Sequence, residues 1–544
     1  MRPDRLPKLA LLALCLVLLW APAQSQPGRS LLRRDTRWLD SPGRDQFPDA
    51  EAVIVYDDIR FEVHSDGSTA YHEHDAIKIL NADGVQNHGS LVRVYRQGEA
   101  EIQVDFARTI LPDGRVVDVT AEHIVDAPFI PRSRAYGSYR RFEIQFPQVV
   151  PDAVVEFHLV TRRKPGYRKA WWATSYVQNP EPILVSIFSV QAPRDLTVNW
   201  SAPGLLPSRP VRMQAGDTQE LRWEIRGQSA LRNEPAMPDT EDLLGRIDVS
   251  SFSNWDQLGE WYRSAWTARV QPDPRLGLIT AGILPTGSTQ DGKARAIGAW
   301  LAANKKQVDL SYEQMLPLSP SDLLDERVLS YWDTVSLAAA MFEFAGIRCE
   351  PVAGFSMPAE ELSRQLPRPT AVSRVLLYLP DLKRWFDPAH PGDLLASPPG
   401  GFQGRAALFL GPSGPYHLAD LPTADHDANR EDTRVEARVD AEGAAELAIA
   451  KEQFGESALF LREAARSLAA SDQTRREQIL RSLFLALAQS FSPLAQVHDR
   501  YFPDGDPAGP SFPLAVTLIV PDFAAAGEGD LRQIPVPIQF DQRI

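Results

Sequence analysis

The chain has 544 residues, of which 44% are hydrophobic and 24% charged, a balance typical of several globular domains rather than of disorder. It carries 57 Lys and Arg against 71 Asp and Glu, and this net charge of −14 disfavours nucleic acid as the main partner, because phosphate contacts need clustered basic residues. The 2 cysteines are too few for a disulfide framework or an all-cysteine zinc site.

Residues 1–25 have the pattern of a Sec-type signal peptide. Three basic residues precede an apolar run from Leu9 to Trp20, and small residues follow at the expected cleavage point. The run is shorter than the roughly 20 residues that a membrane span needs. We therefore expect a protein exported to the periplasm or secreted, with no transmembrane segment after cleavage; the alternative is an uncleaved N-terminal anchor.

The next part of the chain predicts a linker over 26–47 and an N-terminal β-sandwich domain over 48–228. Apolar and polar residues alternate along many short stretches of the second region, such as AVIVYDDIRFEV and EIQVDFARTI. This period of two is typical of antiparallel strands with one buried face. Turns are expected at Asp66-Gly67, Asp83-Gly84 and Asp113-Gly114.

Residues 229–420 change to an α+β pattern. Asn254 is a suitable N-cap for an aromatic-rich helix, and two further helices are expected over 291–304 and 333–345, the last ended by Gly346. The dense aromatic residues here and at Trp171-Trp172 form either a ligand groove or core packing, and we favour the core. Strands are expected over 347–355, 372–380 and 384–387.

The last part of the chain predicts a polar linker over 421–435 and a C-terminal β-rich domain over 436–544. Helices are expected within this domain at 456–469 and 473–490. The expected fold class is therefore multidomain, β and α+β, with three folded domains after the leader.

No established phosphate-loop, dinucleotide, zincin or α/β-hydrolase motif occurs in the sequence. His72 and His74 would share one face of a strand and could hold a metal with a third ligand. We favour an exposed polar strand edge instead, because no partner cluster is visible. His390 and His417 lie in loops without a supporting motif. We therefore expect neither a metal nor a cofactor.

Four stretches and the last part of the chain resemble known families. FARTILPDGRVVDV and SYRRFEIQFPQVVPDAVVEF resemble the domain of unknown function that precedes transglutaminase-like cores in many exported bacterial proteins. PLSPSDLLDERVLSYWDTVSLAAAMFEFAGIRCEPVAGF and VLLYLPDLKRWFDPA resemble the transglutaminase-like core itself, which is papain-like, and the last part resembles that family's C-terminal β-rich domain. The resemblance implies this domain order for the present chain.

Active members of that family use a Cys-His-Asp arrangement, with the cysteine in a Gly-Asp-Cys-Lys-Asp stretch. The resemblance places the cysteine position on Tyr331, the histidine position on Arg374 and the aspartate position on Asp387. Nucleophile and base are thus both replaced. Cys349 falls on the strand after the helix, where we expect a buried, inert thiol.

Two functions of different classes remain. The first is a non-catalytic protein that binds a peptide, a glycan or another cell-envelope partner, with an Arg374–Asp387 ion pair beside the old cleft. The second is an acyl-transfer or hydrolytic enzyme with an altered centre that uses Ser330 or a loop histidine such as His390. A core that acts only as a spacer is a weaker third reading. The candidate cleft comprises Ser330, Tyr331, Trp332, Arg374, Trp385 and Asp387.

Overall fold

The computed structural model describes residues 37–533 with internal gaps, so the predicted signal peptide and most of the predicted 26–47 linker lie outside the described residues. It is a multidomain structure rich in β-sheets. No helix among the described residues combines the length and apolarity needed to span a membrane. The positions left out are 1–36, 204, 206–208, 233, 235–236, 238–242, 272, 311–312, 412–415, 490–491, 506, 508–510, 527–531 and 534–544.

An eight-stranded sheet dominates the N-terminal part, in the order β12-β13-β10-β1-β2-β8-β4-β5. All pairs within it are antiparallel except β1 with β10. Its strands are β1 (Ala52–Val63), β2 (Thr69–Ile79), β4 (Ala100–Ile110), β5 (Val116–Asp118), β8 (Val154–Arg163), β10 (Ile183–Pro193), β12 (Val211–Ala215) and β13 (Thr218–Gln228).

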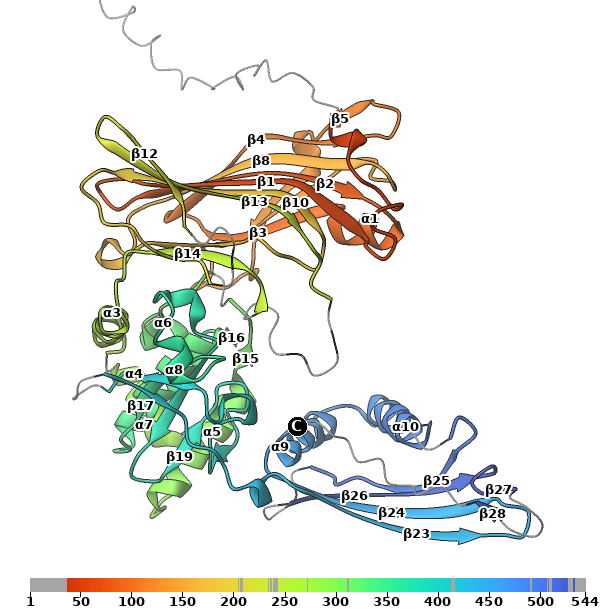
Figure 1. The fold of residues 1–544 in the computed structure, drawn as a ribbon. Coiled ribbons are helices and arrows are strands. Elements are labelled where there is room, and N and C mark those ends of the chain that lie inside the picture. The colour runs from red at the N-terminus through yellow and green to blue at the C-terminus, as the bar shows by residue number, and fades with distance from the viewer. Residues whose placement is uncertain are drawn as a thin grey trace, which may run out of the picture.

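Two three-stranded sheets form a second layer against this sheet (Figure 1). Alternation along the strands supplies both apolar faces: Phe157 of the large sheet packs with Phe142 of one small sheet, and Trp223 packs with Val249 of the other. The small sheets contain β3 (Ser90–Arg96), β6 (Ile124–Pro128) and β7 (Tyr139–Gln145), and β9 (Trp172–Tyr176), β11 (Asn199–Ser201) and β14 (Arg246–Ser250).

The structure differs from the sequence prediction at two places in this region. The strand β14 lies beyond the predicted boundary at 228, yet it pairs with β9 of the N-terminal sheets. At Asp83-Gly84 the chain forms the helix α1 (Ala82–His88) instead of a turn, because Asn81 caps it by accepting from the Gly84 backbone N–H. Gly84 also admits the Glu51 carbonyl, which would lie 2.2 Å from a Cβ there.

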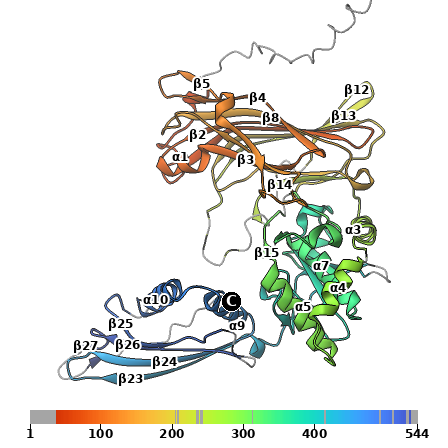
Figure 2. The same ribbon diagram turned by 180° about the vertical axis from the view of Figure 1, so that it is seen from behind.

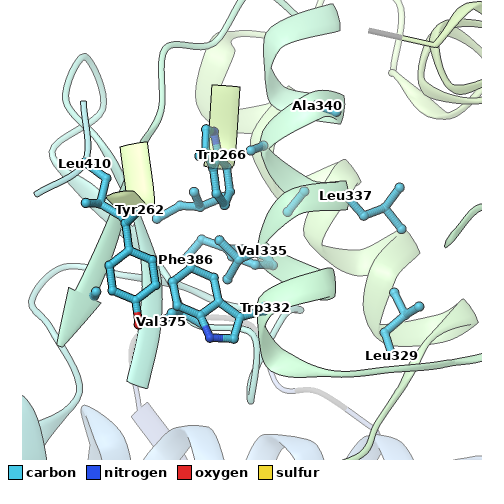
Figure 3. Packing of buried hydrophobic residues seen from close by; sticks show 14 of the residues in the cluster. Tyr262, Trp266, Leu329, Trp332, Val335, Leu337, Ala340, Val375, Phe386 and Leu410 are labelled. Atoms are coloured by element: carbon cyan, nitrogen blue, oxygen red, sulfur yellow. The ribbon is translucent and has the colours of Figure 1, made fainter. Parts of the chain in front are cut away.

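The middle part is α+β, and the helix α7 (Tyr331–Phe344) lies at its centre (Figure 3). Most of its residues are buried, because it packs between other helices and one face of a six-stranded sheet ordered β20-β19-β18-β17-β21-β22. The sheet strands are β17 (Glu350–Gly354), β18 (Arg374–Leu379), β19 (Arg384–Phe386), β20 (Leu394–Leu395), β21 (Ala406–Phe409) and β22 (His417–Asp420).

The three predicted helices of this part are present, and α4 was not predicted. Asp273 caps α4 (Pro274–Ile283), and Pro274 is its first residue. Both residues favour a helix start, but the apolar pattern that follows them was too short to predict the helix. The predicted start of the central helix at 333 is two residues late, because Ser330 is the N-cap. The remaining elements are α3 (Trp255–Arg269), α4 (Pro274–Ile283), α5 (Gln290–Asn304), α6 (Pro320–Leu323), α8 (Ala359–Leu362), β15 (Lys306–Gln307) and β16 (Val328–Leu329).

The C-terminal part is a four-stranded antiparallel sheet, β23-β24-β26-β25, with two helices on one face (Figures 1 and 2). Both predicted helices are present, but β23 begins at Glu431, five residues before the predicted domain start at 436 and within the predicted 421–435 linker. The elements are β23 (Glu431–Val439), β24 (Ala445–Phe454), α9 (Glu456–Ala469), α10 (Gln473–Gln489), β25 (Gln496–Tyr501), β26 (Ser511–Val520), β27 (Ala525–Ala526) and β28 (Arg532–Gln533).

Short 3-10 turns occur at several junctions, and polar contacts join the three parts there. Asp248 of β14 accepts hydrogen bonds from Arg246 at 3.1 Å and from Arg368 of the middle part at 3.0 Å, all three buried. Glu463 of α9 pairs with His390 at 2.8 Å in the loop after β19. The 3-10 turns are η1 (Arg37–Asp40), η2 (Ala121–His123), η3 (Tyr167–Lys169), η4 (Pro369–Ala371), η5 (Gly400–Phe402) and η6 (His426–Ala428).

Two carboxyl groups face each other inside the N-terminal sheet. Asp57 of β1 lies opposite Asp75 of β2 and accepts a hydrogen bond from Ser186 at 2.7 Å. Burial raises the pKa of Asp57 to about 6 and holds the pKa of Asp75 well above its usual value. The folded state therefore keeps protons that the unfolded chain releases near pH 4, so this pair stabilises the fold less as the pH rises from about 4 to about 6.

We predict that Asp75→Asn reduces this pH dependence, because the variant removes one of the two opposed carboxyl groups. The thermal unfolding midpoint of the wild-type protein should fall more between pH 4.5 and pH 7 than that of the variant. Asp195→Asn, at an exposed position, should retain the wild-type dependence. Equal pH dependence in wild type and Asp75→Asn would contradict the assignment.

Candidate functional site

Three residues that the family resemblance selected meet at the N-terminal end of α7. Tyr331 is the first residue of that helix, Arg374 is the first residue of β18, and Asp387 directly follows β19. Arg374 Nη2 lies 2.7 Å from Asp387 Oδ2, and the guanidinium carbon lies 5.8 Å from the centre of the Tyr331 ring. The predicted Arg374–Asp387 ion pair is therefore present, beside Tyr331.

The ion pair is built around a buried carboxylate. The Asp387 side chain is 1% exposed, and it also accepts a hydrogen bond from the Ala389 backbone N–H at 3.0 Å. A second contact from Arg374 Nε to Asp387 Oδ1 at 3.3 Å makes the pairing bidentate. Because a guanidinium stays protonated in proteins, Arg374 compensates the buried charge but cannot accept a proton as a base.

Ser330 is held as the N-cap of α7. Its hydroxyl oxygen accepts from the Asp333 backbone N–H at 3.1 Å, and its own backbone N–H donates to the Tyr136 hydroxyl at 3.0 Å. Within the part of the chain that the structure describes, no hydrogen bond joins a histidine to Ser330, Tyr331 or Cys349. A serine nucleophile needs such a base within reach. The geometry thus offers Ser330 a structural contact and no base.

Cys349 lies just before β17, and its side chain packs against the core around α7. The thiol is 3.8 Å from the Ala339 carbonyl oxygen of that helix. Burial raises the pKa of the Cys349 thiol to about 12. The thiol is therefore protonated at neutral pH, and its contact is with Ala339 in the middle of α7 rather than with the N-terminus of that helix.

We predict that this thiol reacts slowly in the folded protein. At pH 8 the rate of modification by a thiol-specific disulfide reagent should be at least about a hundredfold lower in native than in urea-unfolded protein lacking residues 1–25, since the thiolate is the reacting species. Absorbance of the released reagent measures both rates. Fast labelling of native protein would contradict the raised thiol pKa of the half-buried Cys349.

Two tryptophans of the predicted cleft do not face it. Trp332 stacks on Tyr262 of α3, with ring centres 5.3 Å apart, inside the core shown in Figure 3. Trp385 packs with Tyr378 on the sheet face opposite α7, because successive strand residues point to opposite faces. The six predicted residues therefore do not line one open cleft, and only Tyr331, Arg374 and Asp387 converge.

No pattern in the sequence pointed to the residue that contacts the N-terminal end of α7. Tyr136, from the loop between β6 and β7, donates its hydroxyl hydrogen to the buried Asp333 carboxylate. That carboxylate also accepts from the Gln314 side chain at 2.9 Å and from the Leu318 backbone N–H at 2.7 Å. Burial nonetheless raises the pKa of Asp333. This network joins the N-terminal sheets to the central helix.

We predict that Tyr136→Phe destabilises the protein by about 1–3 kcal/mol, the usual cost of removing a donor from a buried polar group. The change in the urea unfolding midpoint measures this effect. Tyr139→Phe is the matched control, because Tyr139 is an equally buried tyrosine without a hydroxyl contact in the described network. Equal losses for the two variants would show that packing alone accounts for the effect.

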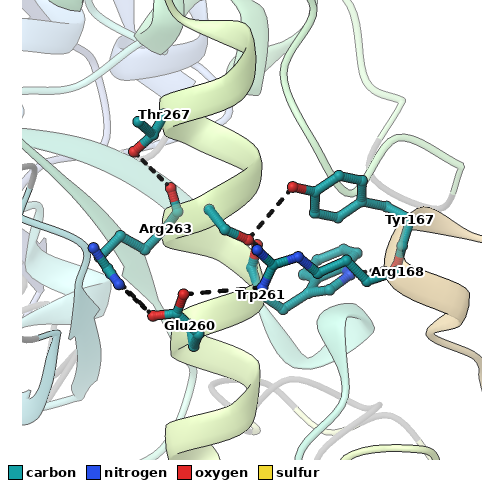
Figure 4. A network of polar contacts seen from close by, with 7 residues as sticks. Tyr167, Arg168, Glu260, Trp261, Arg263 and Thr267 are labelled. Atoms are coloured by element: carbon teal, nitrogen blue, oxygen red, sulfur yellow. Dashed lines mark hydrogen bonds and ion pairs between the residues drawn. The ribbon is translucent and has the colours of Figure 1, made fainter.

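A pocket of about 510 Å³ lies elsewhere, between η3 and the N-terminal half of α3. Arg168 and Lys169 on its rim have φ values of 53° and 57°, a left-handed conformation that costs energy for residues other than glycine. On α3, Glu260 pairs with Arg263, and Trp261 lies behind Arg168 (Figure 4). The lining of the pocket includes Phe252, Asn254, Asp256, Gln257, Trp261 and Tyr416.

The sequence singled out the aromatic residues of α3 but not this pocket. Trp261 is buried in the core and also lines the pocket. The core-packing and the ligand-groove interpretations of the aromatic residues therefore both apply to this tryptophan. The pocket itself could not have been predicted from the sequence, because two residues that line it, Arg168 and Tyr416, are almost 250 residues apart along the chain. The Tyr416 ring lies against Gly259, where a Cβ would be 2.6 Å from it.

His72 and His74 do lie on one side of the large sheet, together with His158. Each histidine instead contacts an acid: His72 is 3.4 Å from Glu62, and His74 is 3.1 Å from Glu156. Among the described residues, the group with metal-like ligand spacing is a different one, Glu51, His88 and Glu181. In that group His88 Nε2 lies 3.1 Å from Glu181 Oε1, which is an ordinary hydrogen-bonding distance.

Comparison with known proteins supports the N-terminal assignment. Residues 65–232 match the family model described as "Domain of Unknown Function with solved-structure structure (DUF3857)". This match confirms that the N-terminal part contains a domain of unknown function, as the sequence predicted. None of the curated proteins matches the chain.

One solved structure shares the fold over most of this chain. The crystal structure of a "putative protease" from Parabacteroides distasonis ATCC 8503 has a TM-score of 0.58 and 14% sequence identity, over 86% of this chain and 93% of that one. This likeness shows a common fold and nothing further. An M1 zinc metallopeptidase from Deinococcus radiodurans has a TM-score of 0.22 and 12% identity, over 36% of this chain and 42% of that one, which is too low to support an argument.

Proposed function

We propose that this chain is an exported, non-catalytic protein with a transglutaminase-like core, and that it binds a peptide or another ligand of the cell envelope. The observation that carries the proposal is the bidentate contact between Arg374 and Asp387 next to Tyr331. These three residues occupy the positions that the family resemblance assigns to base, orienting acid and nucleophile. The framework of such a site is kept, while the groups present cannot form a thiolate or accept its proton.

The local geometry around Tyr331 supports this core assignment. In Leu329–Asp333 the last residue is identical to the Gly-Asp-Cys-Lys-Asp pattern of active members, and Tyr331 lies at the first position of a 14-residue helix. A helix N-terminus stabilises negative charge, which is the reason a nucleophilic cysteine is placed there. Arg374 adds a positive charge at the same point.

The pocket between η3 and α3 is the better place for a ligand than the remnant of the active centre. Its size lies within the range of about 300–1,000 Å³ that small ligands occupy. Arg168 and Lys169 offer cations, Asp256 and Glu260 offer carboxylates, and Tyr416 offers an aromatic face. This mixture suits a peptide segment, whose amide, charged and apolar groups need partners of all three kinds.

We predict that a cysteine introduced by Tyr331→Cys has a lowered thiol pKa. The helix N-terminus and the Arg374 guanidinium both favour the thiolate, so the pKa should fall at least about one unit below the free value near 8.5. The pH dependence of iodoacetamide labelling in a Cys349→Ala background measures it. Phe344→Cys is the matched control, since Phe344 is exposed at the opposite end of the same helix.

Equal pKa values for the two introduced thiols would contradict the transglutaminase-like assignment of the core. The non-catalytic reading has a separate test. Wild-type protein should show no transamidation or peptide hydrolysis above the buffer rate, and a turnover that Tyr331→Phe abolishes would overturn it. Binding in the pocket is tested with a random-sequence peptide array, on which Tyr416→Ser should lose the signals of the wild-type protein.

A further inference from the structure

The strand β23 forms an open edge of the C-terminal sheet. It pairs with β24 along all nine residues, from Glu431 opposite Gln453 to Val439 opposite Ala445. Among the described strands, none pairs with its other side. Every residue of β23 is exposed except Val435, which is half-buried. A strand edge of this length offers unpaired backbone N–H and C=O groups to another strand.

The charges on this edge alternate in sign on one face. Asp432, Arg434, Glu436 and Arg438 are two residues apart and therefore point to the same side of the sheet. Val435, on the other side, packs against the apolar cluster beneath α9 and α10. The charged row therefore lies on the sheet face that these helices leave uncovered.

We propose that a second copy of this chain pairs with β23 in antiparallel orientation, with the two-fold axis at Val435. In this register Arg434 lies opposite Glu436 of the second copy, and Asp432 lies opposite its Arg438. The symmetry repeats both pairs, so four oppositely charged pairs face one another. The two C-terminal sheets would then form one continuous eight-stranded sheet.

The alternating pattern selects this register. A two-fold axis at Arg434 or Glu436 would place like charges opposite each other, which is destabilising in a sheet. Axes at other uncharged residues also match opposite charges, but only the axis at Val435 pairs all nine residues of the strand.

The charges on β23 differ from those that usually protect an edge. Protective charges repel a second edge, whereas a row of alternating sign complements its own reverse copy. Within one chain Arg434 and Glu436 already contact each other at 2.7 Å, with side chains 81% and 61% exposed. Both groups thus remain accessible to a second copy.

Sedimentation velocity of the full mature chain across protein concentrations tests the proposal. Wild type should form a dimer, and Arg434→Glu or Glu436→Arg alone should raise the dimer dissociation constant at least about tenfold, because each puts two like-charged pairs in contact. The double reversal Arg434→Glu with Glu436→Arg should restore the wild-type value. Arg481→Glu, at an exposed position on α10, is the control and should change nothing.

Disulfide trapping tests the register. Val435→Cys should give a cross-linked dimer under mild oxidation, because the two-fold axis brings this position next to its own copy. Thr433→Cys should not, since its copy lies four residues away along the strand. Circular dichroism confirms that each variant is folded. A monomer at all concentrations, a dimer indifferent to the single reversals, or cross-linking through Thr433→Cys alone would each overturn the proposal.

Discussion

A carboxylate without access to water must find hydrogen-bond donors inside the protein, and Asp333 at the start of α7 finds three. One donor, Tyr136, comes from the N-terminal sheets, and the same hydroxyl accepts the Ser330 backbone N–H. The start of the central helix is thereby fixed by a residue almost 200 positions earlier in the chain. The position of Tyr331 depends on this constraint, since Tyr331 is the first residue of α7.

The contact between Arg374 and Asp387 is a second consequence of burying a charge. Asp387 directly follows a short strand whose residues are largely buried, and without a cation its carboxylate would be costly there. In an active Cys-His-Asp centre a histidine would meet the aspartate. In this chain Arg374 meets the aspartate and compensates its buried charge, but a guanidinium does not accept a proton. Under the proposed transglutaminase-like assignment, the ion pair would take the structural place of the histidine without its acid–base chemistry.

The charged side chains on the edge strand β23 of the C-terminal sheet differ from these buried pairs. Here the groups are exposed, each isolated pair contributes little, and only a repeated, symmetric arrangement can give a specific interaction. The alternating signs along β23 provide that arrangement. The buried pairs of the middle part fix one chain, whereas the exposed row on β23 is suited to joining two.

Much of the fold could be predicted from local patterns. Alternation located strands of the N-terminal sheets, and helical patterns located α3, α5, α7, α9 and α10, with the terminal residues Asn254 and Gly346 recognised for α3 and α7. Two misses have local causes: Asn81 turned an apparent Asp-Gly turn into α1, and Asp273 with Pro274 started α4 without a long apolar pattern. The pairing of β14 with β9 could not be predicted from the sequence of either strand, because the burial of apolar surface in the folded domain decides which strands lie side by side.

In the candidate site, too, some features could be predicted from the sequence and others could not. The sequence by itself determined that no cysteine is adjacent to Tyr331 along the chain and that residue 374 is an arginine, because residue types and their order need no folding to be known. Only the tertiary structure decided that Trp332 and Trp385 face away from each other, that Tyr136 closes the helix, and that η3 and Tyr416 enclose a pocket. These depend on which distant surfaces exclude water from one another, and such contacts leave no periodic trace in a single sequence.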